Sequence, residues 1–122
     1  EINELKDIAE MLEKALGQQQ AATMWFMNNA MQNPNHLGAG AHHYMHIMGI
    51  VTLGWMWLRM AKTATKALGN SPSDAAYYEA KLTSARYYAE RFLPDAGALR
   101  RKLEAGSESM MALDEEAFAT AA

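Results

Sequence analysis

The stretch "IMGIVTLGWMWLRMAK", residues 47–62, decides how this chain folds. Its first twelve residues, Ile47 to Leu58, carry no charge, and Arg59 and Lys62 then close the run. A transmembrane helix needs about 20 apolar residues, whereas twelve residues make only about 18 Å of helix. An apolar helix that is too short to span a membrane is typical of the middle of a helical bundle. We therefore expect no membrane span.

Two features of this stretch predict how closely it packs. Gly49 and Gly54 weaken a helix, so we expect a neighbouring helix to approach closely at both positions. Trp55 and Trp57 point to different sides of the helix, which predicts contact with more than one neighbour. We predict that the Trp55 indole is buried, so that cutting it to alanine would cost roughly 3–5 kcal/mol of stability.

Helical spacing of apolar residues continues on both sides of this stretch. It predicts one long helix over about residues 2–32, turn chemistry at 33–40, and a second helix over about residues 39–68. Ser71 as N-cap and Pro72 at the first helical position predict a third helix through residue 93. Pro94 should end or kink that helix.

The C-terminal part is expected to be less regular. Residues 95–106 add about three more helical turns, residues 107–113 one or two, and residues 113–122 form a frayed tail. No segment alternates with the period of two that strands require. We predict an all-α fold, a single helical domain over residues 1–122. Its architecture is an up-down antiparallel bundle of three long helices plus a kinked or short C-terminal helix.

Charge and composition narrow the class of protein. The 122 residues carry a formal net charge of −3 and contain no cysteine, which excludes disulfides and thiolate chemistry. Basic residues concentrate in 59–104 but are mixed with acids at helical spacing, so we expect a solvated face and no nucleic acid partner. No signal peptide is visible, which favours a cytoplasmic protein. The chain begins already in helical rhythm, as a piece of a longer protein would.

Three segments carry a resemblance to a known family. The stretches "LGWMWLRMAK" at 53–62, "YYEAKLTSARYYAERFLP" at 77–94 and "MMALDEEAF" at 110–118 resemble the extreme C-terminus of one branch of the acyl-CoA dehydrogenases, which carries an extra helical domain. They occur in the order and spacing of that family. The resemblance covers most of the chain from about residue 35 onward.

The resemblance implies an FAD-dependent parent enzyme that desaturates an acyl-CoA thioester between its alpha and beta carbons. A carboxylate base would take the alpha proton while a hydride passes from the beta carbon to the flavin. In the family, the flavin pocket, the base and the CoA channel lie in upstream domains that do not match this sequence. We therefore assign no catalytic or cofactor-binding residue here, and expect the isolated chain to be no enzyme. Its role would be accessory: packing against the upstream domains, assembly, or a surface at the substrate entrance.

The histidines offer a different interpretation. His42 and His46 are spaced i, i+4, and His43 and His46 are spaced i, i+3, and either pair can present two imidazoles to one metal ion. Further ligands would have to come from Asp or Glu on other helices. The more ordinary interpretation is that these are partly exposed histidines near a helix end. We assign no metal site, and keep His42 and His46 as candidate ligands.

Several other residues have two possible roles. The pairs Tyr77–Tyr78 and Tyr87–Tyr88 should each place one ring in the core and the other at its rim, although ligand stacking is an alternative. Five methionines lie among aromatic residues at helical spacing, so core filling is favoured over an adaptable binding groove: Met24, Met27, Met48, Met56 and Met60. Arg59 either pairs with an acid such as Glu79 or Glu90 or extends to solvent.

The first helix predicts a contact surface. In "AATMWFMNNAM", Met24, Trp25, Phe26 and Met27 cover more than one stripe, which exceeds what the core of the bundle needs. We predict an interface there, toward the upstream domains or a second copy, and hence a homo-oligomer. Two alternatives stay open: an independent bundle that binds an apolar ligand, or a metal through His42 and His46, and a self-contained bundle that simply dimerises.

Overall fold

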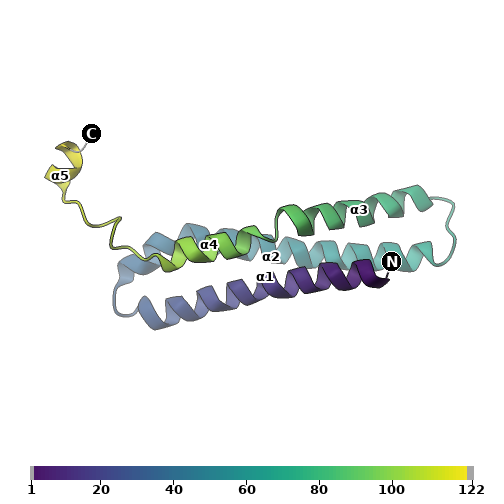
Figure 1. Cartoon of the computed structure of the whole chain (residues 1–122), viewed down its shortest axis with the longest axis horizontal. Coiled ribbons are helices and arrows are strands. Elements are labelled where there is room, and N and C mark those ends of the chain that lie inside the picture. The colour runs from purple at the N-terminus through teal and green to yellow at the C-terminus, as the bar shows by residue number, and fades with distance from the viewer. Residues whose placement is uncertain (1, 121–122) are drawn as a thin grey trace.

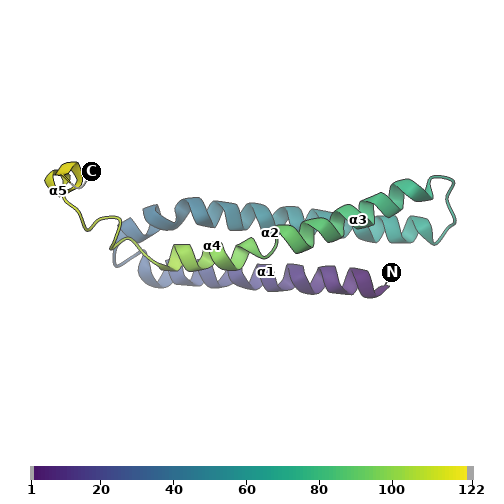
Figure 2. The same cartoon turned by 45° about the horizontal axis from the view of Figure 1, so that its top comes forward.

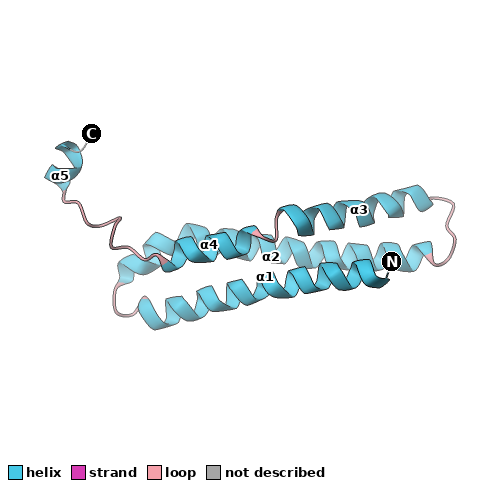
Figure 3. Ribbon diagram, viewed as in Figure 1, coloured by secondary structure: helices cyan, strands magenta, loops and turns pink. Residues whose placement is uncertain are grey.

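The chain forms a long helical bundle, described over residues 2–120 by a computed structural model. Helix α1 (Ile2–Asn29) lies antiparallel to α2 (Pro34–Leu68), and α3 (Ala75–Arg91) and α4 (Asp95–Glu104) follow one another along α2 as a third rod (Figure 1). The short α5 (Glu115–Thr120) stands apart from the bundle at the end of a segment of turns and bends, in both views (Figure 2). No strand occurs within residues 2–120 (Figure 3). The predicted all-α, up-down architecture is confirmed.

The second helix begins earlier than predicted. It starts at Pro34 rather than near residue 39, because the Asn33 side chain accepts a hydrogen bond from the backbone N–H of Asn35 at 3.1 Å and acts as N-cap. Pro34 occupies the first helical position, where its missing N–H costs nothing. The turn predicted at 33–40 is therefore confined to the few residues before Pro34, and α1 ends at Asn29.

The third helix also begins at a different residue than predicted. Ser71 adopts a left-handed backbone conformation with φ of 50°, and its N–H bonds to the carbonyl of Leu68. It therefore belongs to the turn after α2 and does not cap α3, which begins at Ala75 after Asp74. Pro94 does interrupt the third rod as predicted: α3 ends at Arg91 and α4 begins at Asp95.

Residues after α4 differ from the prediction in two places, with less helix over 107–113 and more helix over 115–120. Residues 107–113 form turns and bends instead of one or two helical turns. Within the predicted frayed tail, residues 115–120 form α5, while residues 121–122 lie outside the described part. Whether the tail frays in solution stays a prediction.

The core is built around close helix contacts at glycines of α2. A Cβ atom on Gly54 would lie 2.8 Å from Leu93 Cδ2 and 3.1 Å from Leu12 Cδ1, so the helices approach closely there, as predicted. Gly49 has nothing within 4 Å of such a Cβ, so the same expectation is wrong at that position. Gly40 makes an equally close approach, at 2.8 Å from Phe26 Cζ, which was not predicted from the sequence.

Small side chains fill much of the remaining core. Seven of its sixteen buried apolar residues are alanines: Ala15, Ala22, Ala61, Ala64, Ala85, Ala89 and Ala96. Tyr88 is buried and donates a 2.6 Å hydrogen bond from its hydroxyl to the carbonyl of Ile50, tying α3 to α2. The predicted division of the tyrosine pairs is confirmed, because Tyr77 and Tyr87 are exposed.

The large apolar side chains of α2 lie mostly outside. Trp55 is 51% exposed, so the prediction that it is buried is wrong, and with it the expected cost of 3–5 kcal/mol for removing its side chain. Gly54 faces the core, and one residue along a helix turns the side chain by about 100°, which carries Trp55 outward. Trp57 is half-buried and stacks on Tyr88 at 6.4 Å between ring centroids.

The expectation of methionine core filling is wrong for the same reason. All five methionines named for that role are exposed. Ile47 and Gly54 lie seven residues apart on the inward face of α2, and Ala61 continues that row. Met48, Met56 and Met60 fall on other sides of α2, and Met24 and Met27 lie on the outward side of α1. No helix among the described residues is both long and apolar enough to be a membrane span.

Candidate docking surface

Helix α1 presents one outward stripe of large apolar side chains. Leu16, Met24, Met27 and Met31 recur at helical spacing and are all exposed, with Met31 at 89%. Thr23, beside this stripe, lies 2.6 Å by its hydroxyl from the Tyr44 hydroxyl of α2. The stripe therefore runs along the side of α1 that borders α2.

Helix α2 presents a matching stripe on its side toward α1. Met45, Met48 and Trp55 are exposed and recur at i, i+3 and i+10. Tyr44, which contacts α1, precedes Met48 by one turn, whereas Ile50 marks the side toward α3 through its bond with Tyr88. The two stripes thus lie on either side of the line along which α1 and α2 pack together. We call this surface the α1–α2 face: Leu16, Met24, Met27, Met31, Met45, Met48 and Trp55.

The four residues predicted as an interface divide between this face and the core. Met24 and Met27 point outward and belong to the α1–α2 face. Phe26 is 9% exposed and packs edge-on against Tyr44, with ring centroids 5.3 Å apart. Trp25 is half-buried beside Phe26 and His36. The outward methionines, rather than the two aromatic rings, are therefore the available contact residues.

The structure brings His42 and His46 together near the start of α2. Their ring centroids are 4.4 Å apart, and both side chains are exposed. Among residues 2–120, no group of three or more His, Asp or Glu side chains is placed to hold a metal ion. The pair therefore lacks the further protein ligands that a tetrahedral site requires.

His43 faces inward and is electrostatically unusual. Its Nδ1 atom is buried and has no hydrogen-bond partner within the described structure. Burial, the largest cause, lowers the pKa of this imidazole from its ordinary value of 6.5. The positive charges of His42, Lys102 and His46 act in the same direction. The neutral form of His43 is therefore the form that fits the fold.

Acidification should consequently destabilise the bundle through His43. In the unfolded chain this imidazole takes up a proton below about pH 6.5, whereas the folded state resists protonation to lower pH. The stability that His43 contributes is thus present above pH 6.5 and lost as the pH falls through its lowered folded pKa. Urea melts at pH 7.5 and 5.5 should show a smaller loss for His43→Leu than for the original chain. An equal loss in both proteins would contradict this role of His43.

His36 ties the segment after α4 to the start of α2, a role that its position in the sequence did not reveal. Its Nδ1 accepts a 3.1 Å hydrogen bond from the N–H of buried Ser107, and the Ser107 hydroxyl lies 3.0 Å away. Its Nε2 lies 3.6 Å from a carboxylate oxygen of Glu108. Gly106 has a φ of 77° and makes the turn that brings Ser107 back to α2. The one sequence signal for this contact was Gly106, a glycine at the end of the residues predicted to be helical.

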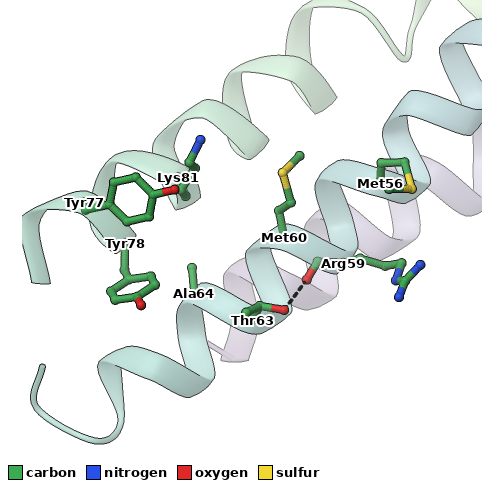
Figure 4. A pocket seen from close by; sticks show the side chains of 8 residues that line it. All are labelled: Met56, Arg59, Met60, Thr63, Ala64, Tyr77, Tyr78 and Lys81. Carbon is green, nitrogen blue, oxygen red and sulfur yellow. Dashed lines mark hydrogen bonds between the residues drawn. The ribbon is translucent and has the colours of Figure 1, made fainter. Parts of the chain in front are cut away.

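An open groove of about 510 Å³ lies between α2 and α3 (Figure 4). Met56, Met60 and Tyr77 give it an apolar lining, and Arg59 and Lys81 supply positive charge. The Arg59 guanidinium lies 4.9 Å from the ring centroid of Trp55. Arg59 thus extends along the surface and makes no ion pair with a carboxylate of residues 2–120, so pairing with Glu79 or Glu90 is not observed. We call this the α2–α3 groove.

A second groove of about 540 Å³ lies between α1, α3 and α4. Neither groove fits a flavin cofactor, whose pyrophosphate needs free backbone N–H groups such as those of a glycine-rich turn or a helix start. The α2 residues of the first groove lie in mid-helix, where amides bond to the preceding turn, and on its α3 side the N–H of Tyr77 bonds to the carbonyl of Asp74 at 3.0 Å. At the start of α4, the amides of Asp95, Ala96 and Gly97 already bond to nearby carbonyls.

Comparison with known proteins identifies a family for this chain. Residues 1–114 match the family model described as "Acetyl-CoA dehydrogenase C-terminal like". The chain is 32% identical, over 122 aligned positions, to the broad-specificity linear acyl-CoA dehydrogenase FadE5 of Mycobacterium tuberculosis. That alignment covers 93% of this chain but only 20% of the length of the relative. The chain therefore belongs to the family of C-terminal domains of acyl-CoA dehydrogenases.

Proposed function

We propose that this chain is an accessory helical domain of an FAD-dependent acyl-CoA dehydrogenase and performs no catalysis of its own. The observation that carries the proposal is the α1–α2 face, seven large apolar side chains on two neighbouring helices. Contiguous apolar surface of this kind is characteristic of an interface. In this proposal the face packs against the upstream domains of the parent, where it supports assembly or borders the substrate entrance.

The family supports the remaining parts of the proposal. The chain spans one fifth of an enzyme named as a linear acyl-CoA dehydrogenase, so the proposed parent would hold the flavin and the catalytic base in its other domains. Its reaction would be desaturation of an acyl-CoA between the alpha and beta carbons. The absence of cysteine is compatible with the cytoplasm, which we propose as the location of the parent.

Exposing the α1–α2 face should make the isolated domain self-associate. At about 100 µM, even a micromolar dissociation constant leaves little monomer. Met27→Glu places a charge on this face without touching the core, and should weaken self-association about tenfold or more in sedimentation equilibrium. Trp25→Glu is less informative, because Trp25 is half-buried against Phe26 and His36.

Thr83→Glu is a matched control, since it adds the same charge at an exposed position of α3 that belongs neither to the face nor to either groove. It should leave self-association unchanged, and circular dichroism should show both variants folded. Equal weakening by the two variants would contradict the proposed face. The genomic reading frame gives an independent test: dehydrogenase sequence upstream of Glu1 supports the proposal, and a start codon immediately before Glu1 opposes it.

A further inference from the structure

The segment after α4 forms an acidic and apolar arm. We define this arm as residues 108–120, which include exposed Met110, Met111 and Leu113, and Phe118 at 72% exposure. The chain from residue 105 onward has four carboxylates and no basic residue. Glu115 and Glu116 make no ion pair with any side chain in residues 2–120. The arm therefore combines hydrophobic side chains and negative charges that the bundle does not use.

The α2–α3 groove has the complementary character. Met56, Met60 and Tyr77 offer apolar contact. Arg59 and Lys81 have no carboxylate within ion-pair distance in the described structure, and each lies over an aromatic ring of its own helix. The Tyr77 ring holds Lys81 beside the groove, whereas Arg59 lines its other end and points its guanidinium away from Tyr77 and Lys81 (Figure 4), so an acidic helix entering the groove would meet Lys81 directly.

An arm cannot lay its helix in the groove of its own chain. Ser107 is held against His36 near the start of α2, and Met56, at the near end of the groove, lies 20 residues farther along, about 30 Å away. The eight residues from Ser107 to Glu115 span at most about 26–29 Å when fully extended. The N–H of Met111 also bonds to the carbonyl of Ser107 at 2.9 Å, a turn that shortens this reach further.

We propose that the arm of one chain docks in the α2–α3 groove of a second copy, with Phe118 among the groove methionines and Glu115 and Glu116 toward Lys81. The arm leaves the bundle at one end, and the groove lies toward the other, near the α2–α3 turn (Figures 1 and 4). Two antiparallel copies can therefore exchange arms reciprocally in a closed, two-fold dimer. This contact is separate from the α1–α2 face and does not depend on the proposed function.

A peptide-binding experiment isolates this contact. A fluorescein-labelled peptide of residues 107–120 is titrated with the full chain carrying Glu115→Gln, Glu116→Gln and Phe118→Ala, whose own arm lacks the side chains proposed to dock. We expect saturable binding by fluorescence anisotropy that weakens as salt rises. Adding Lys81→Glu to the chain should weaken binding about tenfold, and Lys81→Gln should weaken it less. Lys62→Glu is the matched control, because Lys62 carries the same charge on α2 but does not line the groove.

If Lys81 pairs directly with Glu115 or Glu116, exchanging the charges between groove and peptide should restore binding. A peptide with lysines at positions 115 and 116 should bind the Lys81→Glu chain better than it binds the chain with Lys81 intact. Absence of peptide binding at several hundred micromolar chain, or equal weakening by Lys62→Glu and Lys81→Glu, would overturn the proposal. Met27→Glu should leave peptide binding unchanged, so failure of the arm contact and failure of the α1–α2 face are distinguishable.

Discussion

Replacing Gly54 by leucine should lower the free energy of unfolding by about 1–2 kcal/mol. A Cβ at this position already lies 2.8 Å from Leu93 and 3.1 Å from Leu12, and Tyr88 closes a third side at 3.5 Å. The remaining carbons of leucine have no space unless α1, α2 and α3 separate, and overpacking of this kind typically costs 1–3 kcal/mol. The improved helix propensity of leucine offsets roughly 0.8 kcal/mol of the strain. Urea denaturation followed by circular dichroism measures the change.

Gly49→Ala is the control on the same helix. Nothing lies within 4 Å of a Cβ built there, so the substitution gains helix propensity without strain. We expect it to raise the free energy of unfolding by about 0.5–1 kcal/mol. If Gly54→Leu proved neutral, or if Gly49→Ala destabilised the chain as much, the close approach of the helices at Gly54 would be wrong.

Ile47→Ala should destabilise the bundle by about 2–5 kcal/mol. Ile47 is 0% exposed and is among the largest fully buried side chains, so its removal leaves a cavity in addition to the lost transfer energy. Trp55→Ala, eight residues further on, removes a much larger side chain but one that is half in solvent. Its loss should cost less than about 1 kcal/mol, chiefly the contact with the Arg59 guanidinium.

The order of these two effects is the informative result. Side-chain size alone would make the tryptophan substitution the more damaging of the two. Urea melts of both variants at the same pH compare them directly. A larger loss for Trp55→Ala than for Ile47→Ala would place α2 in a different rotation about its axis and would remove Trp55 from the α1–α2 face.

The helices were predictable because apolar spacing and proline positions act locally. Pro94 interrupts the third rod wherever its neighbours pack, since its ring blocks the helical hydrogen bond. The orientation of α2 about its own axis was not predictable from the sequence. Apolar residues occur on nearly all sides of this helix, so their spacing does not show which side faces the core. Glycine at positions 40 and 54 marks the inward face instead, through the close approach of Phe26 and Leu93.

The candidate surfaces were predictable only in part. The surplus of apolar residues in α1 did point to a contact surface, whose test awaits the Met27→Glu experiment. The pairing of that stripe with Met48 and Trp55 depends on how α1 and α2 align, which sequence spacing does not give. The contact of His36 with Ser107 joins residues 71 positions apart, so no local pattern indicates it.

The alanine-rich core has a consequence for how the stability of this domain is measured. With small residues inside and methionines outside, much of the available hydrophobic energy is released only when another surface covers the bundle. Folding and association are then thermodynamically linked, and a partner present at 100 times its dissociation constant adds about 2.7 kcal/mol to the apparent stability. The melting temperature of the isolated domain should therefore rise with protein concentration, and its value in dilute solution sets a lower bound for the domain in its assembled state.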